Sequence, residues 1–158
     1  MDFSMEVDLK ISDKVFKGNV RDVVKINEGN LIDEFSKQPS IYAWFATLAE
    51  MAIAQVERLR FDLSITRAKL DSVKRAELMS GDSKKITESM VEAALVTDAR
   101  IMALTEELMI ANKQVGILKA IVRSLEQRCS MLVQLGATKR QEMLVDGVNI
   151  GRIRENNN

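Results

Sequence analysis

Residues 101–132 read IMALTEELMIANKQVGILKAIVRSLEQRCSML, and this stretch decides the fold. Its apolar residues recur at intervals of three and four, the heptad pattern of a helix that buries one face along its whole length. The members of this heptad row that we expect in the core or between subunits are Ile101, Leu104, Leu108, Val115, Leu118, Val122, Leu125 and Leu132. A second row, Ile110, Ile117 and Ile121, widens the apolar face, so the sequence predicts an oligomerising helical bundle.

The composition suits long helices in one domain. The chain has 158 residues, with one proline and seven glycines. Aromatic residues make up 4%, so aliphatic residues and nine methionines are expected to fill the interior. The single cysteine, Cys129, falls on the heptad row, where we expect burial, and one cysteine fits a reducing cytoplasm. No apolar run approaches about 18 residues, so no membrane-spanning helix is predicted.

Several classes of chemistry lack their usual residues. The chain contains no histidine, the commonest general base and neutral metal ligand. Glycine-rich phosphate loops, nucleophile elbows and calcium loops are also absent. A pair such as Glu106 with Lys113 on a helix surface is more often an ordinary salt bridge than a catalytic pair. We therefore expect a binding protein that is not an enzyme and uses no metal or cofactor.

The two ends of the chain show weaker patterns. Phe3–Ile11 alternates apolar and polar residues, as a half-buried strand does. A single strand needs a partner edge, and Met143–Ile153 is one candidate, although flexible tails fit both ends equally well. The predicted organisation is an N-terminal strand-like segment or arm (1–18), a helical domain (19–140) and a C-terminal tail (141–158).

Short helices are expected before the first long helix. One covers about 19–26 and another about 31–36, and after Pro39 we expect Ser40 to cap the long helix. The apolar face predicted for this long helix contains Ile41, Phe45, Leu48, Ala52, Val56, Leu59, Leu63, Leu70 and Val73.

The second long helix follows a loop near Gly81. Thr87 is the expected cap of a helix that breaks at about Thr97 and Asp98, and the heptad helix then ends near Gly136 or one turn later. The predicted fold class is therefore all-α: two long antiparallel helices with short N-terminal helices and short β segments at the termini, forming an oligomerising helical bundle.

Positive charge gathers in two places although the formal net charge is zero. Arg60, Arg67 and Lys74 fall seven residues apart and share one helix face, which could follow a phosphate backbone. The second half of the heptad helix carries Lys113, Lys119, Arg123, Arg128, Lys139 and Arg140. Cations late in a helix also complement its dipole and need bind nothing, and the pattern alone favours this solvated surface.

The chain has one aromatic cluster, Tyr42, Trp44 and Phe45. Exposed aromatic residues stack on bases in many single-strand binders. Packing in the core is the favoured interpretation here, because Phe45 belongs to the predicted buried face and Trp44 would lie beside it or at a subunit contact.

Taken in order, these pieces resemble the UvsY-type recombination mediators of tailed bacteriophages, over about residues 31–140. The resemblance rests on several short matches and a polar, glycine-containing loop, none of them specific alone. The matching residues are Tyr42, Trp44, Arg67, Ala68, Lys69, Leu70, Asp71, Lys85, Thr87, Glu88, Leu95, Asp98, Arg128, Leu135 and Arg140.

The resemblance implies a ring-shaped homo-oligomer that binds single-stranded DNA through its phosphates, in the cytoplasm of an infected bacterial host. It also implies partners, a phage recombinase and a single-strand-binding protein, and a role in loading the first onto DNA covered by the second. The family's basic pair falls on Arg67 and Lys69. The full set of candidate DNA-binding residues is Arg67, Lys69, Arg60, Lys74, Arg75, Lys84 and Lys85. The alternative is a structural or scaffolding coiled-coil assembly protein with no DNA role.

Overall fold

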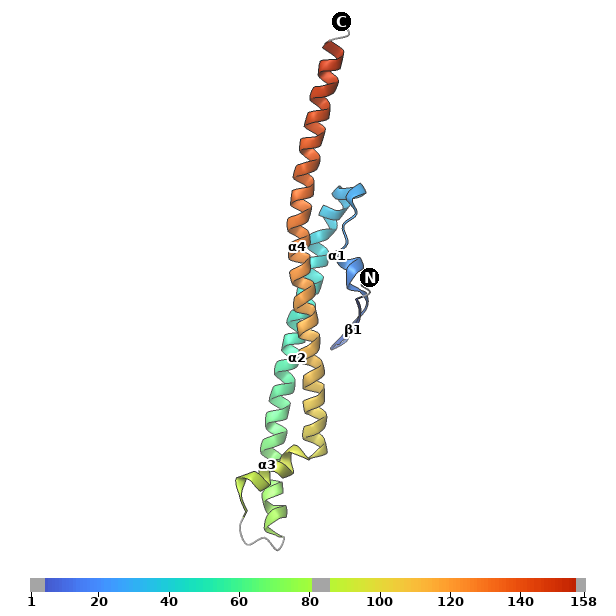
Figure 1. Ribbon diagram of the computed structural model, residues 1–158. Coiled ribbons are helices and arrows are strands. Elements are labelled where there is room, and N and C mark those ends of the chain that lie inside the picture. The colour runs from blue at the N-terminus through green and yellow to red at the C-terminus, as the bar shows by residue number, and fades with distance from the viewer. Residues whose placement is uncertain (1–4, 81–85, 156–158) are drawn as a thin grey trace. The chain divides into compact units, whose positions relative to one another are not determined.

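The structure is a computed structural model that describes residues 5–80 and 86–155, with side chains through residue 145. It is mostly helical, as predicted, and it has two short strands at the N-terminal end (Figure 1). The elements in chain order are β1 (Glu6–Ile11), β2 (Lys14–Asn19), α1 (Val20–Val24), the 3-10 helix η1 (Glu28–Asn30), α2 (Leu31–Met79), α3 (Glu88–Val96) and α4 (Ala99–Glu155).

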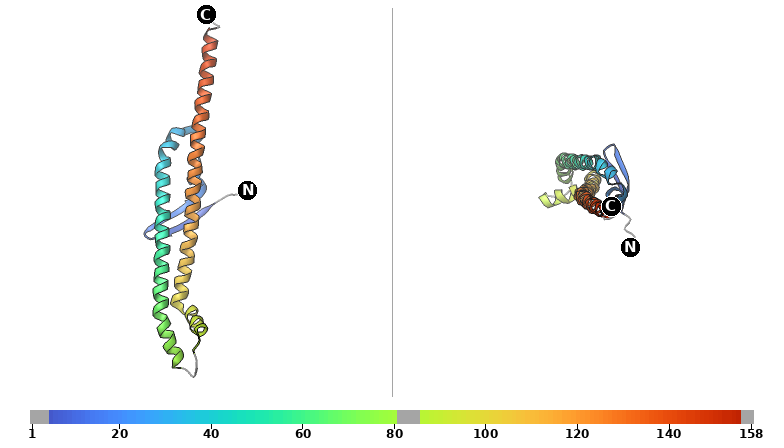
Figure 2. Two further views of the ribbon diagram at one scale, coloured as in Figure 1. Left: turned by 90° about the vertical axis from the view of Figure 1, so that its left-hand side faces the viewer. Right: turned by 90° about the horizontal axis from the view of Figure 1, so that it is seen from above.

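The chain divides into two compact units. Unit 1 takes its described residues from Met1–Asp8, Phe16–Thr47 and Lys119–Asn158, and unit 2 consists of Leu9–Val15 and Leu48–Leu118. Helices α2 and α4 therefore contribute a segment to each unit, and within each unit these segments lie side by side (Figures 1 and 2). No helix in the described part of the chain is long and apolar enough to span a membrane.

The N-terminal strand pairs with a neighbour in sequence. Strands β1 and β2 form a two-stranded sheet, joined at a turn where Ser12 has a φ of 52°. The predicted partner, Met143–Ile153, is wrong, because that stretch belongs to helix α4. A two-residue turn with a positive φ at its first residue joins adjacent strands and closes only a short loop. Closing a short loop costs little chain entropy, which favours the local hairpin over a distant partner.

Helix α2 runs through Pro39 without a break, which corrects the predicted new helix capped at Ser40. Proline removes one helical hydrogen bond and crowds the preceding turn. Contacts beside the proline compensate: the Gln38 side chain is buried in unit 1 and its Nε2 donates a hydrogen bond to the Leu125 carbonyl, 2.8 Å away. Tertiary packing thus overrides the local stop signal.

The core of unit 2 gathers around α3. Leu70 of α2, Val91 and Leu95 of α3 and Ile101 of α4 form one buried apolar cluster. The predicted break between the two helices is confirmed, because α3 ends at Val96 and α4 starts at Ala99. The predicted burial of Val73 is wrong, since its side chain is 46% exposed.

The heptad row in α4 is buried unevenly. Ile101, Leu118, Leu125 and Leu132 are at most 5% exposed, which places them in the core. The members that are only half-buried are Leu104, Leu108, Val115 and Val122. Cys129 is exposed, which corrects its predicted burial. In the flanking row, Ile121 is buried and Ile110 is 53% exposed.

Helix α4 was expected to end near Gly136 or one turn later, but it continues to Glu155. A Cβ atom at Gly136 would lie 3.1 Å from Cζ of Phe35 in α2. The glycine therefore provides room for an aromatic ring from the neighbouring helix in unit 1. Its role is close packing, so it does not terminate the helix.

Candidate nucleic-acid interface

The described basic residues predicted to bind DNA all lie on α2, within unit 2. Arg60, Arg67 and Lys69 are exposed, and Lys74 and Arg75 are half-buried. Lys84 and Lys85, the other two candidates, lie outside the described residues.

Arg67 forms an ion pair that joins α2 to α3. Its Nη2 donates a hydrogen bond to the carboxylate of Glu92, and this bond raises the pKa of the arginine above its usual value. Both side chains are about half exposed. An exposed pair of this kind contributes little to stability, so a phosphate can compete with Glu92 for the guanidinium.

Arg75 is bound by two carboxylates. Its Nη2 and Nη1 donate to Glu88 at 2.7 and 2.9 Å, and its Nε donates to Asp71 at 2.7 Å. These hydrogen bonds raise the pKa of Arg75 and lower the pKa of Glu88. Glu88 is the first residue of α3, so Arg75 fixes the first turn of α3 against α2. Its positive charge is already balanced by these two carboxylates.

Lys74 approaches the start of α4. Its Nζ lies 3.0 Å from a carboxylate oxygen of Glu77 and 3.6 Å from one of Asp98. Asp98 accepts hydrogen bonds from the side chain and backbone N–H of Arg100, and these lower the pKa of its carboxyl to about 2. The side chain of Asp98 is only 9% exposed, so this cluster holds the start of α4 in place.

The basic residues of α2 that form no ion pair with another described residue are not those of the predicted row Arg60, Arg67 and Lys74. Arg60 pairs with Glu57 at 2.7 Å, whereas Lys69 is exposed and forms no ion pair with another described residue. Arg58 is also exposed and forms no ion pair with another described residue, and the basic residues predicted from the sequence did not include it. The two are eleven residues apart, about three helical turns, so they lie on one face of α2 roughly 16 Å apart. That spacing is the sequence signal that identifies Arg58.

Arg128, predicted among the exposed cations of the heptad helix, is buried in unit 1. Its side chain is 4% exposed and forms an ion pair with Glu34 of α2. It also donates to the Gln38 side-chain oxygen and, at 3.3 Å, to the backbone carbonyl of Lys25. Arg128 lies seven residues after Ile121 and four before Leu132, both buried, so it shares their helix face, and this spacing from Ile121 is the signal that could have identified it.

The other described cations of unit 1 are exposed. The described ones that form no ion pair with another described residue include Arg21, Lys25, Lys119 and Arg123. Lys139 lies 3.5 Å from Glu142 in an exposed pair on α4.

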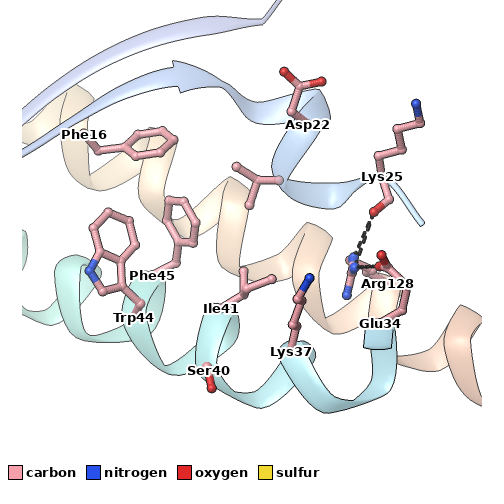
Figure 3. A pocket seen from close by; sticks show the side chains of 11 residues that line it. Phe16, Asp22, Lys25, Glu34, Lys37, Ser40, Ile41, Trp44, Phe45 and Arg128 are labelled. Atoms are coloured by element: carbon pink, nitrogen blue, oxygen red, sulfur yellow. Dashed lines mark hydrogen bonds and ion pairs between the residues drawn. The ribbon is translucent and has the colours of Figure 1, made fainter. Parts of the chain in front are cut away.

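Beside Arg128 lies a pocket of about 540 Å³ in unit 1. Trp44, Phe45 and Phe16 form an aromatic wall at one end, and Arg128 and Glu34 lie at the other (Figure 3). Phe45 is buried and Trp44 packs beside it, as predicted, while the Trp44 side chain stays 44% exposed. The described residues contain no group of His, Cys, Asp and Glu that could hold a metal ion.

The comparisons with known proteins relate this chain to others by its fold. No protein-family model matches the sequence, and no curated protein matches it. The structure is similar to the crystal structure of the bacteriophage T4 recombination mediator protein UvsY, with a TM-score of 0.63 and 11% sequence identity. The similarity covers 78% of this chain and 92% of the UvsY chain. At this identity the likeness establishes a shared fold.

Proposed function

We propose that this chain is a single-stranded DNA-binding recombination mediator. In this proposal it acts as a homo-oligomeric ring, without enzymatic activity, in the cytoplasm of an infected bacterial host. It helps load a phage recombinase onto DNA covered by single-strand-binding protein. The observation that carries the proposal is the fold shared with the UvsY recombination mediator over nearly all of that chain.

The charges on α2 support DNA contact through phosphates. Lys69 and Arg58 have no carboxylate among the described residues to satisfy them, so phosphate oxygens are their natural partners. Two such cations would bind DNA only weakly in a single subunit. A ring repeats them once per subunit, and the linked contacts bind far more tightly than a single copy does.

Arg67 takes a conditional role in the proposal. Its partner Glu92 is half exposed, so a DNA phosphate can replace that carboxylate with little loss of stability. Lys74 and Arg75 contribute less to DNA binding, because they already hold α3 and the start of α4.

The proposed mechanism is noncovalent. A strand bound and organised by the ring is held in a conformation that favours the recombinase filament over the single-strand-binding protein. The ring shifts the DNA from the state covered by single-strand-binding protein to the state bound by recombinase, because it has a higher affinity for the conformation that the recombinase binds.

Fluorescence anisotropy with labelled single-stranded and double-stranded oligonucleotides, titrated with salt, tests the proposal. We expect preferential binding to the single strand, with an affinity that falls steeply as salt rises. Replacing both Arg67 and Lys69 by alanine should weaken this binding and leave the protein folded. Absence of binding at low salt would contradict the proposal and favour the scaffolding alternative.

Single variants assign the contacts. Lys69→Gln should reduce the slope of log affinity against log salt by about 0.7 for each DNA phosphate released. Lys14→Gln is a matched control, because Lys14 is an exposed lysine that lies 3.5 Å from Asp13 in the hairpin turn. Glu92→Gln should tighten DNA binding by releasing Arg67 from its carboxylate. If Lys14→Gln and Lys69→Gln have equal effects, the assignment of the site is wrong.

A further inference from the structure

The pocket of unit 1 combines an exposed aromatic ring with a cation on one face of α2. Lys37, Ile41 and Trp44 are four and three residues apart, so they share that face, and all three line the pocket. Seven residues of helix separate Lys37 from Trp44, a rise of about 10 Å. In Figure 3 the amine of Lys37 lies between the side chains of Ile41 and Arg128, and Trp44 stands beyond Ile41.

Trp44 is held in a fixed orientation while much of its ring faces solvent. Its ring centroid is 4.7 Å from that of Phe45, with the planes at 89°, and 5.7 Å from that of Phe16, at 63°. Edge-to-face contacts of this kind are favourable and specific in geometry. The indole nevertheless stays 44% exposed, which is unusual for the only tryptophan of a chain so poor in aromatic residues.

Three cations, Lys25, Lys37 and Arg128, and two carboxylates, Asp22 and Glu34, line the pocket, so its lining carries a small positive excess that favours an anionic group at the end away from Trp44. Glu34 and Arg128 are buried together, so each already has its partner. Lys37 pairs with Asp33 at 2.6 Å, but the lysine is 60% exposed and the aspartate 40%, so a phosphate can compete for the amine. Ser40, which also lines the pocket, adds a hydroxyl donor.

We propose that this pocket is a nucleobase subsite for single-stranded DNA, in which a base packs against Trp44 and the adjoining phosphate binds the Lys37 amine. The proposal rests on the proposed function and adds to it, since the basic residues of α2 recognise only phosphates. A base-stacking aromatic next to a cation is the usual arrangement in proteins that bind single strands without sequence preference. The volume of about 540 Å³ is within the range of small-molecule sites.

The test uses the full-length protein, with Trp44 as its own reporter. A thymidine oligonucleotide and an abasic oligonucleotide of equal length carry the same phosphates, so they differ only in their bases. We expect the thymidine strand to quench tryptophan emission and to bind at least about fivefold more tightly than the abasic strand. Both affinities are measured by anisotropy of a label on the DNA.

Variants separate the two halves of the subsite. Trp44→Phe should keep most of the preference for the thymidine strand, and Trp44→Leu should abolish it. Lys37→Gln should weaken binding of both strands. Lys17→Gln is its matched control, because Lys17 also forms an exposed pair, 2.8 Å from Asp8, and does not line this pocket.

Three results would overturn the subsite. Equal affinity for both oligonucleotides without quenching would remove it and leave the proposed function standing. No binding of either oligonucleotide at low salt would overturn both proposals. Emission that changes with protein concentration in the absence of DNA would show that a second copy of the chain covers Trp44.

Discussion

The guanidinium of Arg128 and the carboxylate of Glu34 form a buried ion pair that joins α4 to α2 in unit 1. Their side chains are 4% and 14% exposed. Arg128 also bonds to Gln38 and to the carbonyl of Lys25, so one side chain connects three segments of the unit. Among the described residues, no buried side-chain polar atom lacks a hydrogen-bond partner.

Removing one member of this pair should destabilise the protein strongly. Arg128→Met leaves the Glu34 carboxylate buried without its cation, and we expect a loss of about 3–5 kcal/mol in the free energy of unfolding. Chemical denaturation measures the change. The double variant Arg128→Met with Glu34→Met should lose much less, because no isolated charge remains. Equal losses in the two variants would show that the pairing itself is unimportant.

Asp98 should make stability depend on pH in the acid range. Its pKa is lowered from 3.8 to about 2 in the folded protein by the hydrogen bonds from Arg100, so the folded state binds this proton less readily than the unfolded state. The stabilisation is therefore complete above about pH 4 and lost as the pH falls towards 2. Thermal unfolding measured from pH 2 to 7 should show that the stability advantage of wild type over Asp98→Asn is constant above about pH 4 and shrinks as the pH falls from 4 to 2. A difference that stays constant down to pH 2 would contradict the assignment.

Two glycines of α4 provide a matched pair of helix substitutions. Gly116 has no atom within 4 Å of an added Cβ, so Gly116→Ala should stabilise the protein by about 0.5–1 kcal/mol through helix propensity. At Gly136 the added Cβ would lie 3.1 Å from the Phe35 ring. Gly136→Ala should therefore gain less or destabilise. Urea denaturation of both variants checks this order, and equal gains would mean that the Phe35 ring moves freely.

Pro39 should weaken the helix that contains it. Pro39→Ala restores a backbone N–H inside α2 and removes the crowding of the preceding turn, which favours the folded state by about 3 kcal/mol. Greater freedom of the unfolded chain offsets about 0.4–1 kcal/mol of this. We expect a net gain of roughly 2 kcal/mol in chemical denaturation. A loss of stability would indicate that the proline ring makes a contact that alanine cannot replace.

Local patterns in the sequence were sufficient for the helical architecture. The spacing of Ile101, Leu118, Leu125 and Leu132 predicted a buried face on α4, and all four are in the core. The break before Ala99 and the strand near the N-terminus were also predicted correctly. These features depend on helix periodicity, capping and alternation, which act over a few residues and are therefore legible in one sequence.

The candidate site was predicted only as a set of residue types. The sequence placed a basic face on α2, but it could not show that Arg67 and Arg75 meet Glu92 and Glu88 of α3. Each partner lies more than ten residues away, and charges alone do not specify which carboxylate a cation meets. Lys69 is one of the predicted cations that the structure leaves without a partner among the described residues.

The sequence by itself determined the positions of most helices and most of their apolar faces, because backbone propensity and side-chain period are local properties. Only the tertiary structure decided the rest. In the tertiary structure α2 continues through Pro39, and the first strand pairs with its neighbour in sequence. Arg128 is buried, whereas Cys129 and Trp44 are exposed. Each of these outcomes depends on which side chains of the neighbouring segments lie beside the residue, since burial and pairing energies arise from contacts between segments of the folded chain.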